Sequence, residues 1–505
     1  MSIHSRLITV VLFGALVALA MVGCSENIEK PPVQSVANPT ATVPSATATP
    51  EQQSAPTTEP TTTPSAVPSD RESDATPIVV LTVKPTATQE PVPERAIATG
   101  SVDRIAFEDD SGSIFTVNPD GTDIRIVGEG SLVSGERRYT FPVWSPDGGS
   151  VLFSSFLIIG NAFSQSALHR ADADGNGPVV TLAVDPASQG VVDPASQGGV
   201  GPGVAHFSAW SPNGDLIAVT AGRELGIGSM LVDSHSGEQP KSIGFGAPLY
   251  INWAPDGSSI LMHQGAGLYL ISVDRSTSRI PVTIGVGSAS FNSPSWSPDG
   301  KSFAHIEALP RGSSVVITDL SDLAIHKIIA SGDDFVALGW SPDGKNIAIR
   351  RSDGTTYGAL SIYDVVAEEE RIIYEGEVQA FWWSPDGSKL AIIERSTDIF
   401  VAHTWLVIDV DSGDVTNLVT HLGSDQFMFV QSFFDQYAES HNIWSPDSSR
   451  IVISGVILDV EKMLQSGGSA DLPAEIASHI WVIDASGEDE PFSVARGTIA
   501  SWSAQ

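Results

Sequence analysis

The chain has 505 residues, of which 60 are acidic and 26 are basic, so its formal net charge is −34. A chain of this length has room for one large domain and further segments. The acidic balance disfavours nucleic acid as a partner, because phosphate binding requires a basic surface. It also disfavours docking on anionic lipid through clusters of basic residues.

The first 23 residues have the layout of a secretory signal. Arg6 precedes an apolar stretch over residues 7–20, which is too short for a comfortable membrane span. Residues 21–24, Met-Val-Gly-Cys, resemble the lipobox of bacterial lipoproteins, although Met21 stands where that family usually has Leu. The resemblance implies that Cys24 is acylated and anchors the protein, outside the cytoplasm, to the bacterial cell membrane or outer surface. Ordinary secretion with one free thiol is the alternative.

Residues 24–95 are rich in Pro, Thr, Ser, Ala and Gln. This composition has too few large apolar side chains to offset the entropy lost on ordering. We therefore expect a disordered tether between the lipidated Cys24 and a folded domain over residues 96–505. Cys24 is the only cysteine, so no disulfide can form within the chain.

A short phrase, Trp-Ser-Pro-Asp-Gly or a close variant, recurs through the second part of the chain. Its copies begin at Trp144, Trp210, Trp253, Trp296, Trp340, Trp383 and Trp444, with a truncated copy at Trp502. Copies between Trp210 and Trp383 are 43 or 44 residues apart, which is the length of a four-stranded propeller blade. Pro, Asp and Gly suit successive positions of a type I turn, so we expect one strand to end at each Trp and the next to return antiparallel.

Each repeat then predicts four strands, A to D, with the tryptophan at the end of strand A. Residues 104–107, 113–117 and 123–127 supply strands B, C and D before the first tryptophan, and the chain ends on a strand A at Trp502. Pairing of these two parts leaves no open sheet edge. The sequence therefore predicts an all-β, eight-bladed β-propeller in which the N-terminal strands B to D are closed by the C-terminal strand A.

The repeats resemble the WD40-like repeats of TolB-type propellers, which also occur in the propeller domains of prolyl oligopeptidase and tricorn-type peptidases. The resemblance covers about residues 97–505 and implies the fold, but propellers host many activities. TolB has a folded N-terminal domain where this chain has a tether, and the hydrolase domain of the peptidases is missing here. We interpret all eight repeat tryptophans as structural residues that fill the space between sheets.

The longer insertions fall in the B–C and D–A connections, which lie on one face of a propeller. They comprise residues 157–166, 184–203, 396–402, 423–439 and 455–477. Loops on a rigid scaffold commonly carry function, so this insertion face is the predicted binding surface. The last insertion places Val456, Ile457, Val460, Met463 and Leu464 at helical spacing, which predicts an amphipathic helix.

One insertion concentrates aromatic residues and is the candidate binding loop. Its proposed contact residues are Phe427, Phe429, Phe433, Phe434, Asp435, Tyr437 and His441. Aromatic and acidic side chains together suit contact with a protein, a peptide or a glycan. The alternative is that the loop packs its own aromatic side chains over the mouth of the central channel.

Motifs for catalysis or metal binding are weak in this sequence. The eleven histidines show no His-x-His or His-Glu-x-x-His spacing, and no nucleophile elbow or phosphate loop appears. We therefore expect a monomeric binding or scaffolding module without a cofactor or metal, rather than an enzyme. Two alternatives remain: a polysaccharide lyase or hydrolase with a site assembled at the channel mouth, and an envelope-assembly scaffold analogous to TolB.

Overall fold

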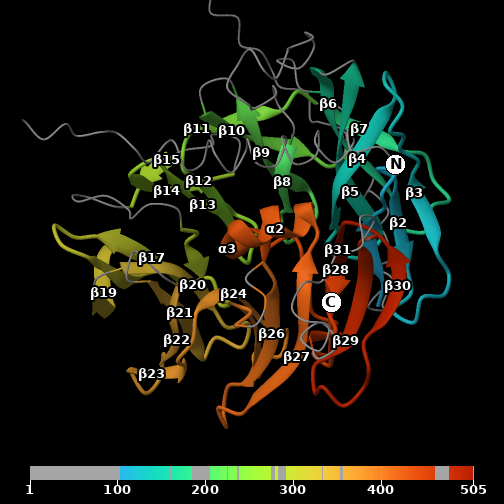
Figure 1. Cartoon of the computed structure of the whole chain (residues 1–505). Coiled ribbons are helices and arrows are strands. Elements are labelled where there is room, and N and C mark those ends of the chain that lie inside the picture. The colour runs from blue at the N-terminus through green and yellow to red at the C-terminus, as the bar shows by residue number, and fades with distance from the viewer. Residues whose placement is uncertain are drawn as a thin grey trace, which may run out of the picture. The chain divides into compact units, whose positions relative to one another are not determined.

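The computed structural model describes residues 103–503, apart from gaps at 160–161, 185–204, 224–225, 236–237, 274–278, 283–291, 333, 353–356, 398, 400 and 461–476. The proposed signal peptide, the lipidation site Cys24 and the tether all lie outside the described residues. Within them the regular secondary structure is almost entirely β-strand (Figure 1). None of the helices found there combines the length and the apolar character needed to cross a membrane.

Three of the four-stranded antiparallel sheets lie in the first half of the fold. One contains β4 (Arg137–Trp144), β5 (Ser150–Ile159), β6 (Ala162–Asp172) and β7 (Val180–Val184). The next contains β8 (Ala205–Trp210), β9 (Leu216–Arg223), β10 (Gly226–Asp233) and β11 (Lys241–Gly246). The third contains β12 (Leu249–Trp253), β13 (Ser259–Gln264), β14 (Gly267–Ser272) and β15 (Arg279–Pro281). The strand order A-B-C-D of the prediction is confirmed in each.

The sheets that follow along the chain keep the same order. One contains β16 (Ser295–Trp296), β17 (Ser302–Ala308), β18 (Ser313–Asp319) and β19 (Asp322–Gly332). The next contains β20 (Asp334–Trp340), β21 (Asn346–Ser352), β22 (Tyr357–Asp364) and β23 (Glu369–Tyr374). A seven-stranded sheet contains β24 (Val378–Trp383), β25 (Lys389–Arg395), β26 (His403–Asp409), β27 (Val415–Gly423), β28 (Arg450–Ile457), β29 (His479–Asp484) and β30 (Phe492–Arg496).

The remaining sheet joins the two ends of the described chain. Its order is β3-β2-β1-β31, and its strands are β1 (Ile105–Glu108), β2 (Ile114–Val117), β3 (Arg125–Gly128) and β31 (Ile499–Trp502). Ile105 lies opposite Trp502 and Glu108 lies opposite Ile499 in an antiparallel register. The predicted closure by the C-terminal strand is therefore confirmed, and the fold is a β-propeller.

The seven-stranded sheet differs from the prediction in two respects. Strand β27 continues to Gly423 and pairs with β28, so Leu422 lies opposite Val456 and His421 lies opposite Ile457. The helix predicted over the last insertion is therefore wrong at Val456 and Ile457, because these residues extend a strand, whereas Val460 is helical as predicted. Met463 and Leu464 lie outside the described residues. Two predicted blades share one sheet because β27 pairs with β28, and the predicted strand A at Trp444 is reduced to an isolated bridge with Ile451. The count of eight blades therefore stays a prediction.

The repeated turn is held by its serine as well as by Pro, Asp and Gly. In the first copy the amide of Gly148 donates to the Ser145 carbonyl at 2.9 Å. The Ser145 hydroxyl donates to Asp147 Oδ1 at 2.6 Å and accepts from the amide of Ser150 at 2.9 Å. The last full copy has Ser448 in place of glycine, and its φ of 59° is left-handed, as the sequence predicts for this position.

The repeat tryptophans link neighbouring repeats through their ring nitrogens. Nε1 of Trp253 donates to the carbonyl of Ala209 at 3.1 Å, and this acceptor directly precedes Trp210 in the repeat before. The equivalent bond recurs at four other repeats, from Trp144 to Ser501, Trp296 to Asn252, Trp383 to Gly339 and Trp444 to Trp382. Trp340 instead bonds within its own turn to Gly344, and Nε1 of Trp210 is buried with no partner among the described residues.

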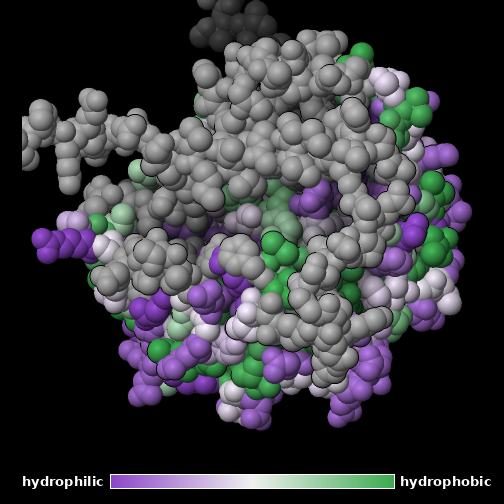
Figure 2. All heavy atoms as spheres, in the orientation of Figure 1, coloured by the Kyte–Doolittle hydropathy of each residue, from purple (hydrophilic) through white to green (hydrophobic). Residues whose placement is uncertain are grey.

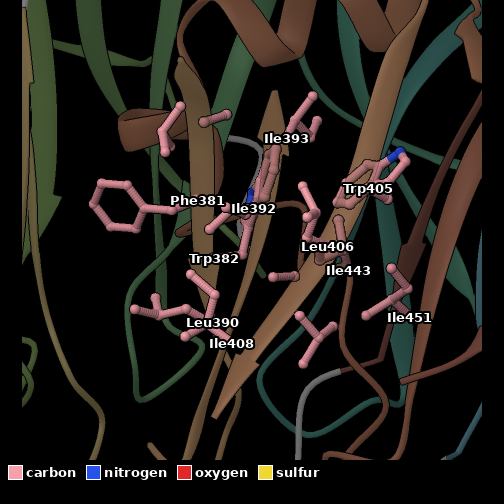
Figure 3. Packing of buried hydrophobic residues seen from close by; sticks show 14 of the residues in the cluster. Phe381, Trp382, Leu390, Ile392, Ile393, Trp405, Leu406, Ile408, Ile443 and Ile451 are labelled. Carbon is pink, nitrogen blue, oxygen red and sulfur yellow. The ribbon is translucent and has the colours of Figure 1, made fainter. Parts of the chain in front are cut away.

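The largest buried cluster joins the seven-stranded sheet to the sheet β20–β23 and to the helices that follow β27. Figure 3 shows Phe381 and Trp382 of β24 packing beside Ile392 of β25 and Trp405 of β26. The rings of Trp382 and Trp405 are stacked, with centroids 5.3 Å apart. At the surface, Figure 2 shows hydrophilic residues interspersed with hydrophobic ones along the described rim.

Candidate functional site

Residues 424–441, called the central segment below, contain two short helices where the sequence predicted a loop. The helices are α2 (Asp425–Ser432) and α3 (Phe434–Tyr437). The Ser424 side chain caps α2 by accepting from the amide of Phe427 at 3.1 Å, and Asp425 adds an acidic residue to the first turn. Figure 1 shows both helices at the centre, where the first strands of several sheets converge.

The aromatic side chains of the central segment point into the protein. Phe427 lies against Trp405 and His421, with ring centroids 5.9 and 5.3 Å away. Phe434 packs edge-on against Phe381 of β24 at 5.1 Å. Both phenylalanines therefore belong to the same buried cluster as Trp382 and Trp405.

The second half of the aromatic set contacts the opposite strands. Tyr437 packs edge-on against Phe207 of β8 at 5.4 Å, and Phe429 lies 6.0 Å from Phe141 of β4. His441 lies against Tyr437 at 5.4 Å. Five of the seven candidate residues are buried, and Phe433 and Asp435 are half-buried. This is the arrangement of the alternative interpretation, in which the segment packs its own aromatic side chains at the centre, and a ligand could reach the buried rings only if the segment moved.

Polar contacts also tie the central segment to the surrounding strands. Nε2 of Gln426 donates to Thr140 Oγ1 at 2.9 Å and to the carboxylate of Glu108, which is fully buried. Glu108 forms an ion pair with Arg138 at 3.0 Å. Burial raises the pKa of Glu108, and the charge of Arg138 opposes this rise. The Tyr437 hydroxyl donates to the carbonyl of His206 at 2.7 Å.

Asp435 is the acidic side chain that the candidate loop brings to the centre. Its carboxylate accepts from the backbone amide of Ser293 at 2.7 Å. Burial raises the pKa of Asp435 to about 6, although this hydrogen bond and the charge of Arg350 both lower it. Gln431 bonds to Gln379 of β24 at 3.0 Å. The central segment thus joins strands that are far apart in the sequence.

A cavity of about 360 Å³ lies where the central segment ends. We call it the tryptophan cavity, and its lining residues are Ala209, Trp210, Pro212, Ile251, Asn252, Trp253, Pro255, Ser295, Trp296, Trp340, Pro342 and Glu439. The aromatic and proline residues come from four consecutive repeats. Glu439 lies two residues after the end of α3. It supplies the only carboxylate among these lining residues.

Glu439 has an unusual environment for an acidic residue. Glu439 is exposed to solvent, and the protein atoms packed around the centre nevertheless raise its pKa. A hydrogen bond with Asn252 opposes this rise. No Lys, Arg or His nitrogen of the described residues forms an ion pair with Glu439. The cavity therefore combines aromatic walls with one carboxyl group that lacks a cationic partner in the described part of the chain.

The sequence did not identify this cavity. From the sequence, the repeat tryptophans were interpreted only as structural residues between sheets, and Glu439 was only the last residue of the insertion 423–439. The repeat period does place the ends of four successive A strands side by side around the centre, so the aromatic wall was predictable in principle. The position of Glu439 follows from the helices of the central segment, which the sequence pattern did not predict.

No protein-family model matches the chain, and no curated protein matches it. Among solved structures it is similar to TolB from Acinetobacter baumannii, with 17% identity over 71% of this chain and 83% of that chain and a TM-score of 0.34. It is similar to putative TolB from Agrobacterium tumefaciens, with 17% identity over 65% and 93% and a TM-score of 0.34. An oligogalacturonate lyase in complex with manganese has 11% identity over 72% and 86% and a TM-score of 0.43. These structures are distant, and the propeller fold is assigned from the strand order of this chain.

Proposed function

We propose that this protein is a binding module that takes a positively charged group of a protein or peptide partner into the tryptophan cavity. The main support for this proposal is that the carboxyl group of Glu439 lies in a cavity lined by Trp210, Trp253, Trp296 and Trp340. Aromatic rings attract cations through their negative faces, and this attraction is stronger where water is partly excluded. A carboxylate at the same place adds a charge-assisted hydrogen bond to an ammonium or guanidinium group.

The acidic surface supports this choice of ligand. A net charge of −34 attracts cationic partners over distance and increases the rate of encounter at low salt. Lysine and arginine side chains and organic ammonium groups share the chemistry that Glu439 and the tryptophans would recognise.

The N-terminal sequence determines where we place this binding module. Lipidation of Cys24 would hold it outside the cytoplasm at a bacterial membrane, and residues 25–95 would act as a tether that lets the propeller reach partners away from the lipid surface. Metabolic labelling with a fatty acid tests this part separately. Labelling should occur in the wild-type chain and be lost in Cys24→Ser.

Titration with short peptides tests the cavity. The full chain should bind Gly-Lys-Gly and Gly-Arg-Gly more tightly than Gly-Gln-Gly, and binding should weaken about tenfold in Glu439→Gln because one charge-assisted contact is lost. Glu369→Gln is the matched control, since Glu369 is an exposed glutamate on β23. Equal binding of the lysine and glutamine peptides, or wild-type affinity in Glu439→Gln, would refute the proposed site.

A second candidate function is an enzyme that acts on an extracellular polysaccharide. Asp435 and Glu439 lie four residues apart in the central segment, and burial raises the pKa of both carboxyl groups. Carboxyl groups with raised pKa values are typical of general acids in such enzymes. Incubation with acidic and neutral polysaccharides should then release reducing or unsaturated ends in the wild type and none in Asp435→Asn.

A further inference from the structure

A cluster of two histidines and one glutamate lies on the sheet β16–β19, apart from the residues that line the tryptophan cavity. His305 and Glu307 belong to β17, and His326 belongs to β19. One ligand atom from each of the three lies within 4.8 Å of the others. We propose that these residues bind a divalent transition metal ion of the zinc class.

The strand geometry brings the three side chains to one face. His305 and Glu307 are two residues apart on β17, so their side chains point to the same side of the sheet. Strand β18 lies between β17 and β19, and its Thr318 pairs with His326. The Thr318 hydroxyl lies 3.0 Å from Nε2 of His305 and 2.9 Å from Nδ1 of His326. Both imidazoles are therefore held on the same face by a single hydroxyl.

The burial of the cluster matches a metal site that is closed on one side and open on the other. His305 is 1% exposed, the Glu307 side chain is 31% exposed, and His326 is exposed. Zinc bound by two histidines and one carboxylate commonly keeps a fourth position for water or a ligand. Here the solvent side, next to His326, would supply that position.

The state of His305 is also suited to a ligand. Its ring is buried, and the Thr318 hydroxyl holds it in place from the Nε2 side at 3.0 Å. A neutral imidazole has the free electron pair that a metal requires. Its Nδ1 atom is buried without a hydrogen-bond partner in the described part of the chain, whereas Nε2, which lies nearer Glu307, would give up its hydrogen bond with Thr318 to bind the ion.

The distances allow coordination with small adjustments. Nε2 of His305 and Oε1 of Glu307 are 4.0 Å apart. Tetrahedral bonds of about 2.0–2.2 Å to both atoms require them to be about 3.4 Å apart, so the Glu307 side chain, which is 31% exposed, would move closer by about half an ångström. His326 is exposed and can turn toward the same point, where it would exchange its hydrogen bond with Thr318 for a bond to the metal. The sequence spacing could not show this site, because the third ligand comes from another strand.

Calorimetric titration with ZnCl₂ tests the site in the full chain carrying Cys24→Ser, so that no thiol competes. We expect one equivalent of Zn²⁺ to bind and to raise the melting temperature, with Ca²⁺ giving no effect because imidazole is a poor ligand for calcium. His326→Ala and Glu307→Gln should each weaken binding by roughly tenfold or more. Both residues are at least partly exposed, so these variants test the site without emptying the core.

His235→Ala is the matched control, because His235 is an exposed histidine that follows β10, outside the cluster. It should bind Zn²⁺ as the wild type does. Replacement of Zn²⁺ by Co²⁺ should also produce the visible absorption of a four-coordinate site in the wild type and lose it in His326→Ala. Absence of saturable Zn²⁺ binding, or wild-type affinity in His326→Ala, would overturn the proposal.

Discussion

Substitution of Asp435 by asparagine should stabilise the protein, and the gain should depend on pH. Burial raises the pKa of this carboxyl group from 3.8 to about 6, so the folded state holds the proton more tightly than the unfolded state does. The stability of the fold therefore falls as pH rises from about 4 to about 6, and the full cost remains above that range. At 1.36 kcal/mol per pKa unit, the charged form costs about 3 kcal/mol near pH 8 and about half as much near pH 5.

Asparagine removes this cost and keeps the side-chain oxygen that accepts from the Ser293 amide. With an unfolding entropy of about 2.1 cal/mol/K per residue over about 400 residues, a gain of about 3 kcal/mol corresponds to about 3–4 °C in melting temperature. Differential scanning calorimetry near pH 8 and pH 5 measures the two values. Asp425→Asn makes the same charge change at an exposed position of the same segment and should shift neither value by more than about 1 °C. An equal shift for Asp435→Asn at both pH values, or a lower melting temperature near pH 8, would refute the reasoning.

Three further predictions concern the scaffold. Deletion of residues 499–505 removes β31 and exposes the edge of β1, so it should cause aggregation on size-exclusion chromatography, whereas deletion of residues 504–505 should not. Ser341→Ala removes a buried hydroxyl that donates to Asp343 and accepts from the Asn346 amide, so urea unfolding should show a loss of about 1–3 kcal/mol. Ser448→Gly relieves a left-handed residue and should raise stability by up to about 1 kcal/mol, reduced by loss of the bond from the Asp386 amide; a decrease in stability would contradict this reasoning.

The scaffold could be predicted because its signals are local and repeated. Each Trp-Ser-Pro-Asp-Gly copy specifies a turn within five residues, and the strand patterns on both sides fix the order of pairing. The pairing of β1 with β31 spans almost 400 residues, yet it followed from counting which strand was missing at each end. The repeat also identified Ser448 as a position that requires a left-handed residue.

The centre could not be predicted in the same way. The aromatic residues between Phe427 and Tyr437 occur in a connection between repeats, where a loop and a short helix pair have similar compositions. The apolar residues Val456 and Ile457 fit either a helix or a strand over so short a length, and pairing with β27 decided for the strand. The cluster of His305, Glu307 and His326 depends on register between strands, which sequence spacing does not contain.

The central segment connects the insertion face, which the sequence identified as functional, with the cavity, which it did not. Helix α3 packs Phe434 against β24 and bonds Asp435 to the Ser293 amide. These contacts also place Glu439, two residues after the helix, among the tryptophans. Because these contacts join several sheets, ligand binding in the cavity would alter the packing of α2 and α3. A cationic ligand that binds Glu439 in the folded protein would also stabilise the segment, because it binds the folded and not the unfolded state. Binding and stability of the centre are therefore expected to be coupled through residues 424–441.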